Sequence, residues 1–264
     1  MAKNLVAFLI RYLPRPFLQN LSRFGKALLP LFYAGKNVQC PICEGTFRKF
    51  LPYGRIHIRS NALCPACLSL ERHRLLWLFL KETTPYLTQP STVLHIAPEP
   101  CLISRLKNIQ GKNYITADLE SPLADIKMDV HHTPFDKETF DLIICNHVLE
   151  HVENDQVVMK ELYRILKPGG MGILQVPFFH PIPETTLEDP AITDPREREK
   201  HFGQSDHVRK YGKDYPTRIK QAGFEPITSS FASTLSDEVV MRYGIVKSEI
   251  IYGGKKTLVR NDAF

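Results

Sequence analysis

Stretches typical of buried strands alternate with stretches typical of amphipathic helices from Thr92 onward, and this alternation restricts the possible folds most. The strand-like stretches are 92–97, 113–120, 124–130, 140–148 and 171–179, the helix-like ones are 101–109, 154–170 and 215–224, and further strand candidates lie near 225–231 and 248–253. Apolar strands separated by amphipathic helices indicate a parallel sheet covered by helices on both faces. We therefore predict a doubly wound α/β fold over residues 92–264.

Polar side chains follow the ends of these predicted strands. The first strand runs into His95–Glu99, the second ends at Asp118, the third at Asp129, and the fourth at Asn146 and His147. Eight of the ten histidines lie at such ends or in the loops that follow: His95, His131, His132, His147, His151, His180, His201 and His207. Because ligands of open α/β sheets bind at the carboxyl ends of the strands, this clustering favours a binding site there.

The stretch DVHHTPFDKETFDLIICNHVLEHVENDQVVMKELYRILKPGGMGILQVP resembles the central part of class I methyltransferases that depend on S-adenosylmethionine (SAM). The Pro-Phe pair before the fourth strand, Leu-Glu-His-Val after it and Lys-Pro-Gly-Gly before the fifth occur in the family's order and spacing. The resemblance is strongest to small-molecule methyltransferases, including quinone-biosynthesis enzymes, and covers residues 92–178. It implies a Rossmann-like, seven-stranded, mostly parallel sheet whose last strand is antiparallel.

The resemblance also implies roles for individual residues. Asp118 would bind the ribose hydroxyls of SAM, Asp129 and Val130 would face the adenine, and Asn146 and His147 would line the methyl-transfer pocket. The complete set predicted to bind the cofactor is His95, Ala97, Glu99, Asp118, Leu119, Asp129, Val130 and Asn146. A base would assist if the methyl acceptor is a hydroxyl or a protonated amine, and His147 and then His207 are the candidates.

The turn after the first strand departs from the family pattern. The family usually has an acidic residue followed by Gly-x-Gly, whereas this chain has His95, Ala97 and Glu99. Glycines in a dinucleotide site let backbone amides approach a pyrophosphate, which a carboxylate would repel. SAM carries no phosphate, and a carboxylate attracts its sulfonium and ammonium groups. The departure therefore disfavours NAD more than SAM, although Glu99 also suits a helix N-terminus without any ligand.

Two Cys-x-x-Cys pairs precede the α/β region. Cys40 and Cys43 are followed, after twenty residues, by Cys64 and Cys67. This spacing is typical of a tetrahedral zinc site, and four thiolates leave no open coordination position, so we predict a structural Zn²⁺. The alternatives are two disulfides, which a cytosolic protein disfavours, or four unrelated core cysteines, which the paired spacing disfavours.

The chain begins with a basic, apolar segment. Residues 1–39 contain six Lys and Arg but no Asp or Glu, so they account for the whole formal net charge of +6. Short helices packed on the body and contact with an acidic membrane surface explain this composition equally well, and nucleic-acid binding explains it less well. No apolar run reaches the roughly 18 residues of a membrane span, and no cleaved signal is evident. We expect a cytoplasmic protein, peripheral to the membrane if the tail binds lipid.

These features predict the domain organisation. We assign residues 1–37 to the helical tail, 38–68 to a zinc ribbon, 69–91 to a connecting helix and linker, and 92–264 to the methyltransferase domain. The segment 178–212 is long for a connection in a compact domain, and its aromatic and charged residues suit a substrate lid. Asp206, His207, Arg209 and Tyr211 are candidates for recognising a polar substrate in this lid; a solvated surface loop is the alternative.

The leading functional hypothesis is a SAM-dependent methyltransferase that acts on a small molecule, such as a sugar or a quinone-like metabolite. An RNA base methyltransferase is a second hypothesis, because a zinc module and a basic tail suit RNA, but the balanced charge outside the tail argues against it. A third is a binding protein that kept the fold and lost catalysis. The sequence does not indicate an oligomeric state.

Overall fold

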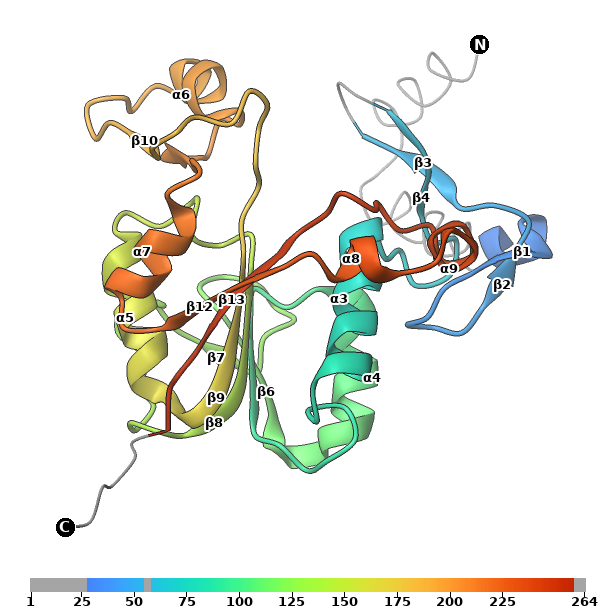
Figure 1. Ribbon diagram of the computed structural model, residues 1–264, viewed down its shortest axis with the longest axis horizontal. Helices are drawn as coiled ribbons and strands as arrows, with labels where there is room; N and C mark the ends of the chain where they lie inside the picture. Colours follow the sequence, from blue (N-terminus) through green and yellow to red (C-terminus); the bar gives the residue numbers. More distant parts are fainter. Residues whose placement is uncertain (1–27, 55–57, 259–264) are drawn as a thin grey trace. The chain divides into compact units, whose positions relative to one another are not determined.

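The computed structural model describes residues 28–54 and 58–258 (Figure 1). Most of the basic tail predicted for residues 1–37 lies outside these ranges. The chain divides into two compact units, one made of the described residues up to Leu78 together with Leu235–Lys247, and the other made of Phe79–Thr234 and the described residues from Ser248. No helix in the described ranges has both the length and the apolar character that a membrane crossing requires.

The second unit is built on a seven-stranded sheet. In spatial order its strands are β12 (Glu225–Ser229), β13 (Ile251–Lys255), β9 (Leu166–Gln175), β8 (Phe140–Asn146), β5 (Val93–Ile96), β6 (Tyr114–Asp118) and β7 (Ile126–Lys127). Strand β13 is antiparallel to both of its neighbours, and the pairs from β9 to β7 are parallel. This arrangement confirms the predicted fold class.

Helices cover the sheet on both faces, with α5 and α7 on one face and α4 on the other (Figure 1). Helix α5 begins after Asn154, whose side chain accepts a hydrogen bond from the Val157 N–H, and its apolar side chains, including Val158 and Leu162, enter the core. The helical segments of this unit are α4 (Pro100–Gln110), η1 (Gly111–Asn113), α5 (Asp155–Ile165), α6 (Pro195–Phe202), α7 (Tyr215–Gln221) and α8 (Phe231–Thr234), and α3 (Glu71–Thr83) starts in the first unit and ends in this one.

Strand β9 starts earlier than predicted. The sequence pattern extended a helix to residue 170, but α5 ends at Ile165 and Leu166 already pairs with Phe140 of β8. Pro168 cannot donate a helical hydrogen bond, and Gly169 has a φ of 79°, which suits glycine. The Gly169 N–H instead donates to the Lys256 carbonyl at 2.7 Å, which ties this part of β9 to the chain beyond β13.

The segment after β9 folds into a small substructure of its own. Strands β10 (Leu187–Glu188) and β11 (Arg209–Lys210) pair antiparallel, and α6 lies between them in the chain (Figure 1). The Asp194 side chain caps α6 by accepting hydrogen bonds from two backbone N–H groups. The Val208 N–H donates to the Glu150 carbonyl at 2.9 Å, so the segment is attached to the loop that follows β8.

The first unit contains two small hairpins and a helix from a distant part of the chain. Among its described residues, β1 (Ala34–Gln39) pairs with β2 (Thr46–Phe47), β3 (Leu51–Tyr53) pairs with β4 (Arg59–Leu63), and α9 (Asp237–Tyr243) belongs to the same unit. The buried guanidinium of Arg74 donates to the carbonyls of Ala62, Ser69, Tyr243 and Gly244. One arginine thus satisfies carbonyls that are near it in the chain and carbonyls about 170 residues further on.

Candidate functional site

A cavity of about 340 Å³ lies at the carboxyl ends of β5, β6, β7 and β8. This volume falls within the usual range for small-molecule and cofactor pockets. Its lining consists of Ile96, Ala97, Asp118, Leu119, Met128, Asp129, Val130, His131, His147, Val148, His151, Val152 and Glu153. Six of the residues predicted to form the site are therefore brought together: Ala97, Asp118, Leu119, Asp129, Val130 and His147.

Asp118 ends β6 with one carboxylate oxygen engaged and the other available. Its Oδ1 accepts hydrogen bonds from the N–H groups of Glu120 at 2.9 Å and Ser121 at 2.7 Å. Within the described ranges Oδ2 has no hydrogen-bond partner, so this oxygen can accept from a ligand hydroxyl. The next residue, Leu119, also lines the cavity, and its side chain is 65% exposed. An exposed apolar side chain beside a free acceptor suits a ligand with a flat ring and hydroxyl groups.

Asp129 follows β7 and is held by the residue two positions further on. Its Oδ1 accepts from the His131 N–H at 2.9 Å and from His131 Nδ1 at 2.7 Å, and these bonds hold the pKa of Asp129 below its usual value. Met128 and Val130 on either side are buried and present apolar surface to the cavity. The part of the cavity at the end of β7 therefore combines an ionised carboxylate with two apolar side chains.

The glycine-free turn after β5 has a conformation that usually favours glycine. Ala97 has a φ of 48°, in the left-handed region, and its N–H donates to the Ala117 carbonyl at 2.9 Å. Alanine adds only a methyl group to such a backbone, so it replaces glycine while the turn geometry is kept. Pro98 and Pro100 restrict the backbone on both sides of Glu99, which precedes α4.

His95, Glu99 and Asn146 form a polar cluster and do not appear in the described lining of the cavity. His95 is fully buried in β5; its Nδ1 contacts the Tyr114 hydroxyl at 2.8 Å and its Nε2 pairs with Glu99 Oε2. Asn146, at the end of β8, donates its amide to Glu99 Oε1 at 2.9 Å. The carboxylate of Glu99 therefore joins the ends of two adjacent strands.

His147, the residue that follows β8, has a strained backbone conformation. Its φ is 54°, which a non-glycine residue adopts at a cost, and its backbone N–H donates to the Gln175 carbonyl at 2.8 Å. His147 Nδ1 lies 3.2 Å from Oε1 of Glu150, which is almost fully buried. A hydrogen bond from Nδ1–H to this carboxylate oxygen corresponds to the tautomer in which Nε2 has the lone pair.

His207 is not among the residues that line this cavity. Its ring is fully buried, its Nδ1 lies 3.2 Å from the Phe202 carbonyl, and its ring centroid is 4.9 Å from that of His151. Burial lowers the pKa of His207, so the ring is neutral at physiological pH. A direct role as base toward a ligand in the 340 Å³ cavity does not fit this position.

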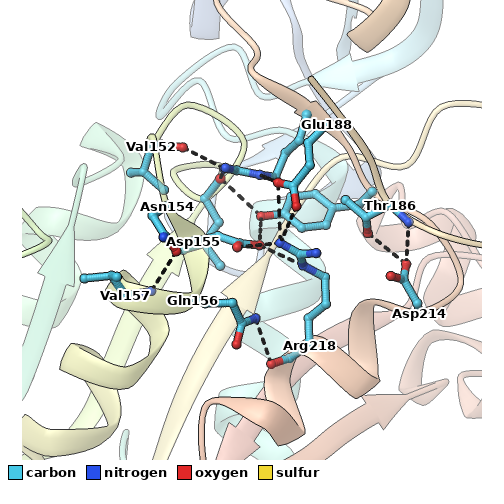
Figure 2. Close-up of polar contacts among 12 residues, drawn as sticks. Val152, Asn154, Asp155, Gln156, Val157, Thr186, Glu188, Asp214 and Arg218 are labelled. Carbon is cyan, nitrogen blue, oxygen red and sulfur yellow. Dashed lines mark hydrogen bonds and ion pairs between the residues drawn. The ribbon is translucent and has the colours of Figure 1, made fainter. Parts of the chain in front are cut away.

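A second cavity, of about 1040 Å³, adjoins the same loop and shares His151 and Glu153 with the first. Figure 2 shows the polar network on its wall, in which Arg218 pairs with both Asp155 and Glu188. Arg209, a candidate for substrate recognition, is instead buried. Its guanidinium donates hydrogen bonds to the Glu188 carboxylate and to three backbone carbonyls, those of Leu149, Val152 and Glu153. Tyr211, another such candidate, is also fully buried and donates to Asp155.

Several lining residues were not among the predicted site residues. They are Ile96, Met128, His131, Val148, His151, Val152 and Glu153. His131 and His151 belong to the cluster of strand-end histidines, so that signal pointed to them without giving a role. The loop 148–153, between β8 and α5, supplies four of these residues.

The four paired cysteines lie together in the first unit. The Sγ atoms of Cys40 and Cys67 are 3.6 Å apart, those of Cys43 and Cys64 are 3.7 Å apart, and all four cysteines are free thiols. Sulfur atoms around a tetrahedral zinc ion lie about 3.8 Å apart, as follows from Zn–S bonds of about 2.3 Å. Four thiolates this close together would repel one another unless a cation lay between them. The cluster therefore fits a metal ion.

Comparisons with known proteins find methyltransferases that match parts of this chain. Residues 82–174 match the family model described as a methyltransferase domain. The ubiquinone/menaquinone biosynthesis C-methyltransferase UbiE of Haemophilus ducreyi is 24% identical over 114 residues, which cover 39% of this chain and 44% of that protein. The demethylmenaquinone methyltransferase of Lactobacillus johnsonii is 34% identical over 70 residues, covering 26% and 27% of the two chains. The chain thus matches less than half the length of these curated relatives.

Among solved structures, the YcgJ protein of Bacillus subtilis has a TM-score of 0.47 and 16% identity, covering 70% of this chain and 99% of that one.

Proposed function

We propose that the chain, whose residues 82–174 match a methyltransferase family model, is a SAM-dependent enzyme that methylates a small-molecule acceptor bearing an ionisable O–H or N–H group. One observation carries this proposal. The ends of β6, β7 and β8 bring Asp118, Asp129 and His147 into a single cavity whose size suits a cofactor.

The residues of this cavity fit SAM. Asp118 Oδ2 is placed to accept from ribose hydroxyls, while Leu119, Met128 and Val130 offer apolar surface for an adenine ring. The turn at Ala97 lets the backbone approach the ligand closely despite the missing glycines. Negative charge from Asp118 and Asp129, together with Glu99 behind the turn, suits a cationic ligand and repels a phosphorylated one.

His147 is the proposed base. SAM, when bound, supplies an activated methyl group. Glu150 fixes the His147 tautomer through the 3.2 Å contact at Nδ1, so Nε2 is ready to accept a proton from the acceptor. The positive φ of His147 directs the side chain from the end of β8 into the cavity. The chain's main contribution is then to align the acceptor and to exclude water.

The acceptor lies, on this proposal, under a lid formed by residues 178–212. The lid is attached through Arg209 and Val208 to the loop after β8, next to the cavity of about 1040 Å³. The curated relatives are named for ubiquinone and menaquinone biosynthesis, so hydroxylated quinone precursors are the first acceptors to assay, followed by sugars.

We further propose that Cys40, Cys43, Cys64 and Cys67 hold a structural Zn²⁺. Four thiolates around Zn²⁺ carry a net charge of −2, and the buried guanidinium of Arg74 lies close enough to interact electrostatically with this cluster. Hydrogen bonds from Arg74 to the carbonyls of Ala62 and Ser69 hold the second cysteine pair in place. The zinc would stabilise a unit with a small apolar core.

Calorimetric titration of the full chain with SAM tests the cofactor assignment. We expect saturable binding, and we expect Asp118→Asn to weaken it at least tenfold, because a ribose hydroxyl would lose a charged acceptor. Asp136→Asn is the matched control, since Asp136 is exposed and lies outside the cavity. Absence of binding at millimolar SAM, or equal affinity in the Asp118 variant, contradicts the assignment.

A further inference from the structure

Three potential metal ligands meet beside the cavity. Glu150, His151 and His207 each place one ligand atom within 4.8 Å of the other two. Glu150 is 1% exposed and His207 is fully buried, and they come from segments more than fifty residues apart in the chain. His151 Nε2 lies 4.0 Å from Glu150 Oε1. The fold therefore assembles two imidazoles and a carboxylate that no single stretch of sequence contains.

Both imidazoles are oriented as metal ligands usually are. His151 Nδ1 lies 3.2 Å from the Asp206 carbonyl, and His207 Nδ1 lies 3.2 Å from the Phe202 carbonyl. A carbonyl only accepts, so Nδ1 carries the proton in each neutral ring and Nε2 has the lone pair. Metal-binding histidines commonly donate their other N–H to a backbone carbonyl or carboxylate, which fixes the ring for coordination.

Two buried polar atoms of the cluster have no partner among the residues that the structure describes. They are Glu150 Oε2 and His207 Nε2. Leaving a buried carboxylate oxygen and a buried imidazole lone pair unsatisfied is costly, and native structures rarely do so without a bound water or ion. Both atoms are acceptors, and a cation would satisfy both at once.

We propose that Glu150, His151 and His207 form a second metal site that takes a divalent first-row transition ion such as Zn²⁺. Two imidazoles and one carboxylate are a known catalytic zinc set with an open coordination position, whereas Mg²⁺ and Ca²⁺ prefer oxygen ligands. Ligand atoms around tetrahedral zinc lie about 3.3 Å apart, given metal–ligand bonds of about 2.0–2.1 Å. The three atoms, which lie within 4.8 Å of one another, would approach to that spacing when the ion binds.

The location of this ion suggests a role in activating the methyl acceptor, which rests on the proposed methyltransferase function. His151 lines both cavities, so the ion lies at the wall that they share. An ion there holds the acceptor hydroxyl and lowers its pKa. The O–H bond then breaks with the proton passing to His147, the oxygen electron pair forms the bond to the methyl carbon, and the C–S bond breaks with its electrons left on sulfur. This favours an oxygen nucleophile over carbon.

Metal titration of the full chain, without SAM, tests the site. Protein purified with its cysteine-bound zinc is titrated with Zn²⁺ and, in parallel, with Co²⁺, by calorimetry and visible absorption. We expect one further equivalent to bind, and Glu150→Gln and His151→Ala to weaken it by more than about 100-fold, because even the loss of an outer partner costs 10–100-fold. His201→Ala is the control, since His201 is an exposed histidine on α6.

The proposal is overturned if no further equivalent of metal ion binds, or if the equivalent that binds does not depend on Glu150. Unchanged metal affinity in both variants also overturns it. His151 is 36% exposed, so His151→Ala tests the site even if Glu150→Gln does not fold. Unfolding midpoints of each variant separate loss of a ligand from loss of the fold. Because SAM is left out, failure here leaves the proposed cofactor site intact, and failure of SAM binding leaves this titration valid.

Discussion

Asp155, the first residue of α5, is hydrogen-bonded to Arg218 of α7 and to Tyr211. Replacing Asp155 with asparagine tests how much these bonds stabilise the fold beside the second cavity. Asp155 is 1% exposed. Arg218 donates to its two oxygens at 2.6 and 3.0 Å, and the Tyr211 hydroxyl donates to it at 2.9 Å (Figure 2). An asparagine at this position would keep the shape but lose the charge and direct an N–H₂ group toward donors.

The expected loss of unfolding free energy is about 2–4 kcal/mol. Breaking one side of a buried ion pair costs roughly 3–5 kcal/mol, because the remaining charge stays buried without its partner. The lower end applies here because Arg218 also pairs with Glu188 at 3.2 Å and is partly exposed. For a chain of this size such a loss lowers the unfolding midpoint by roughly 5–12 °C.

Urea unfolding, followed by circular dichroism and tryptophan fluorescence, measures this change. Asp136→Asn serves as the control for an exposed aspartate, and we expect it to unfold like the unmodified protein. Adding Arg218→Met to Asp155→Asn should recover part of the loss, because the unpaired guanidinium is removed. A loss below about 1 kcal/mol in Asp155→Asn would refute the reasoning that this pair is buried and rigid.

Three further changes have defined outcomes. Hydrogen bonds from Arg164 hold the pKa of Glu161 at about 2, so its stabilisation is complete above pH 4.5 and is lost as pH falls toward 2. Glu161→Gln should therefore flatten the acid limb of the stability profile, and an unchanged limb contradicts this. Ala97→Val should cost about 1–2 kcal/mol because a β-branched side chain meets a left-handed backbone, and thermal unfolding equal to that of the unmodified protein would argue otherwise. Cys67→Ser should reduce bound zinc and destabilise the first unit; full zinc retention by elemental analysis contradicts the four-cysteine site.

The carboxyl-end rule explains why much of the candidate site was predictable. Asp118, Asp129 and His147 end or follow parallel strands of the same sheet, so their convergence at one edge follows from sheet topology once the strands are recognised. Lys167–Gly170 was misplaced in a helix because the local pattern does not reveal that Leu166 and Met171 on either side pair with β8, or that this segment hydrogen-bonds with Lys256. Tertiary pairing decided the structure there.

Long-range contacts explain what the sequence could not indicate. The pairing of His95 with Glu99 is local, but its connection to Asn146 depends on β5 lying next to β8. Arg209 looked like a substrate ligand because its buried carbonyl partners lie more than fifty residues away. The grouping of Leu235–Lys247 with the cysteine unit is equally invisible to sequence periodicity.

An experimental structure of the full chain with S-adenosylhomocysteine bound tests the central claim most directly. We expect the ligand to occupy the cavity of about 340 Å³, with the ribose hydroxyls on Asp118 and the adenine beside Leu119 and Val130. The sulfur should then lie on the side of the cavity lined by His147. A ligand bound elsewhere, or a ribose that does not contact Asp118, would contradict the account.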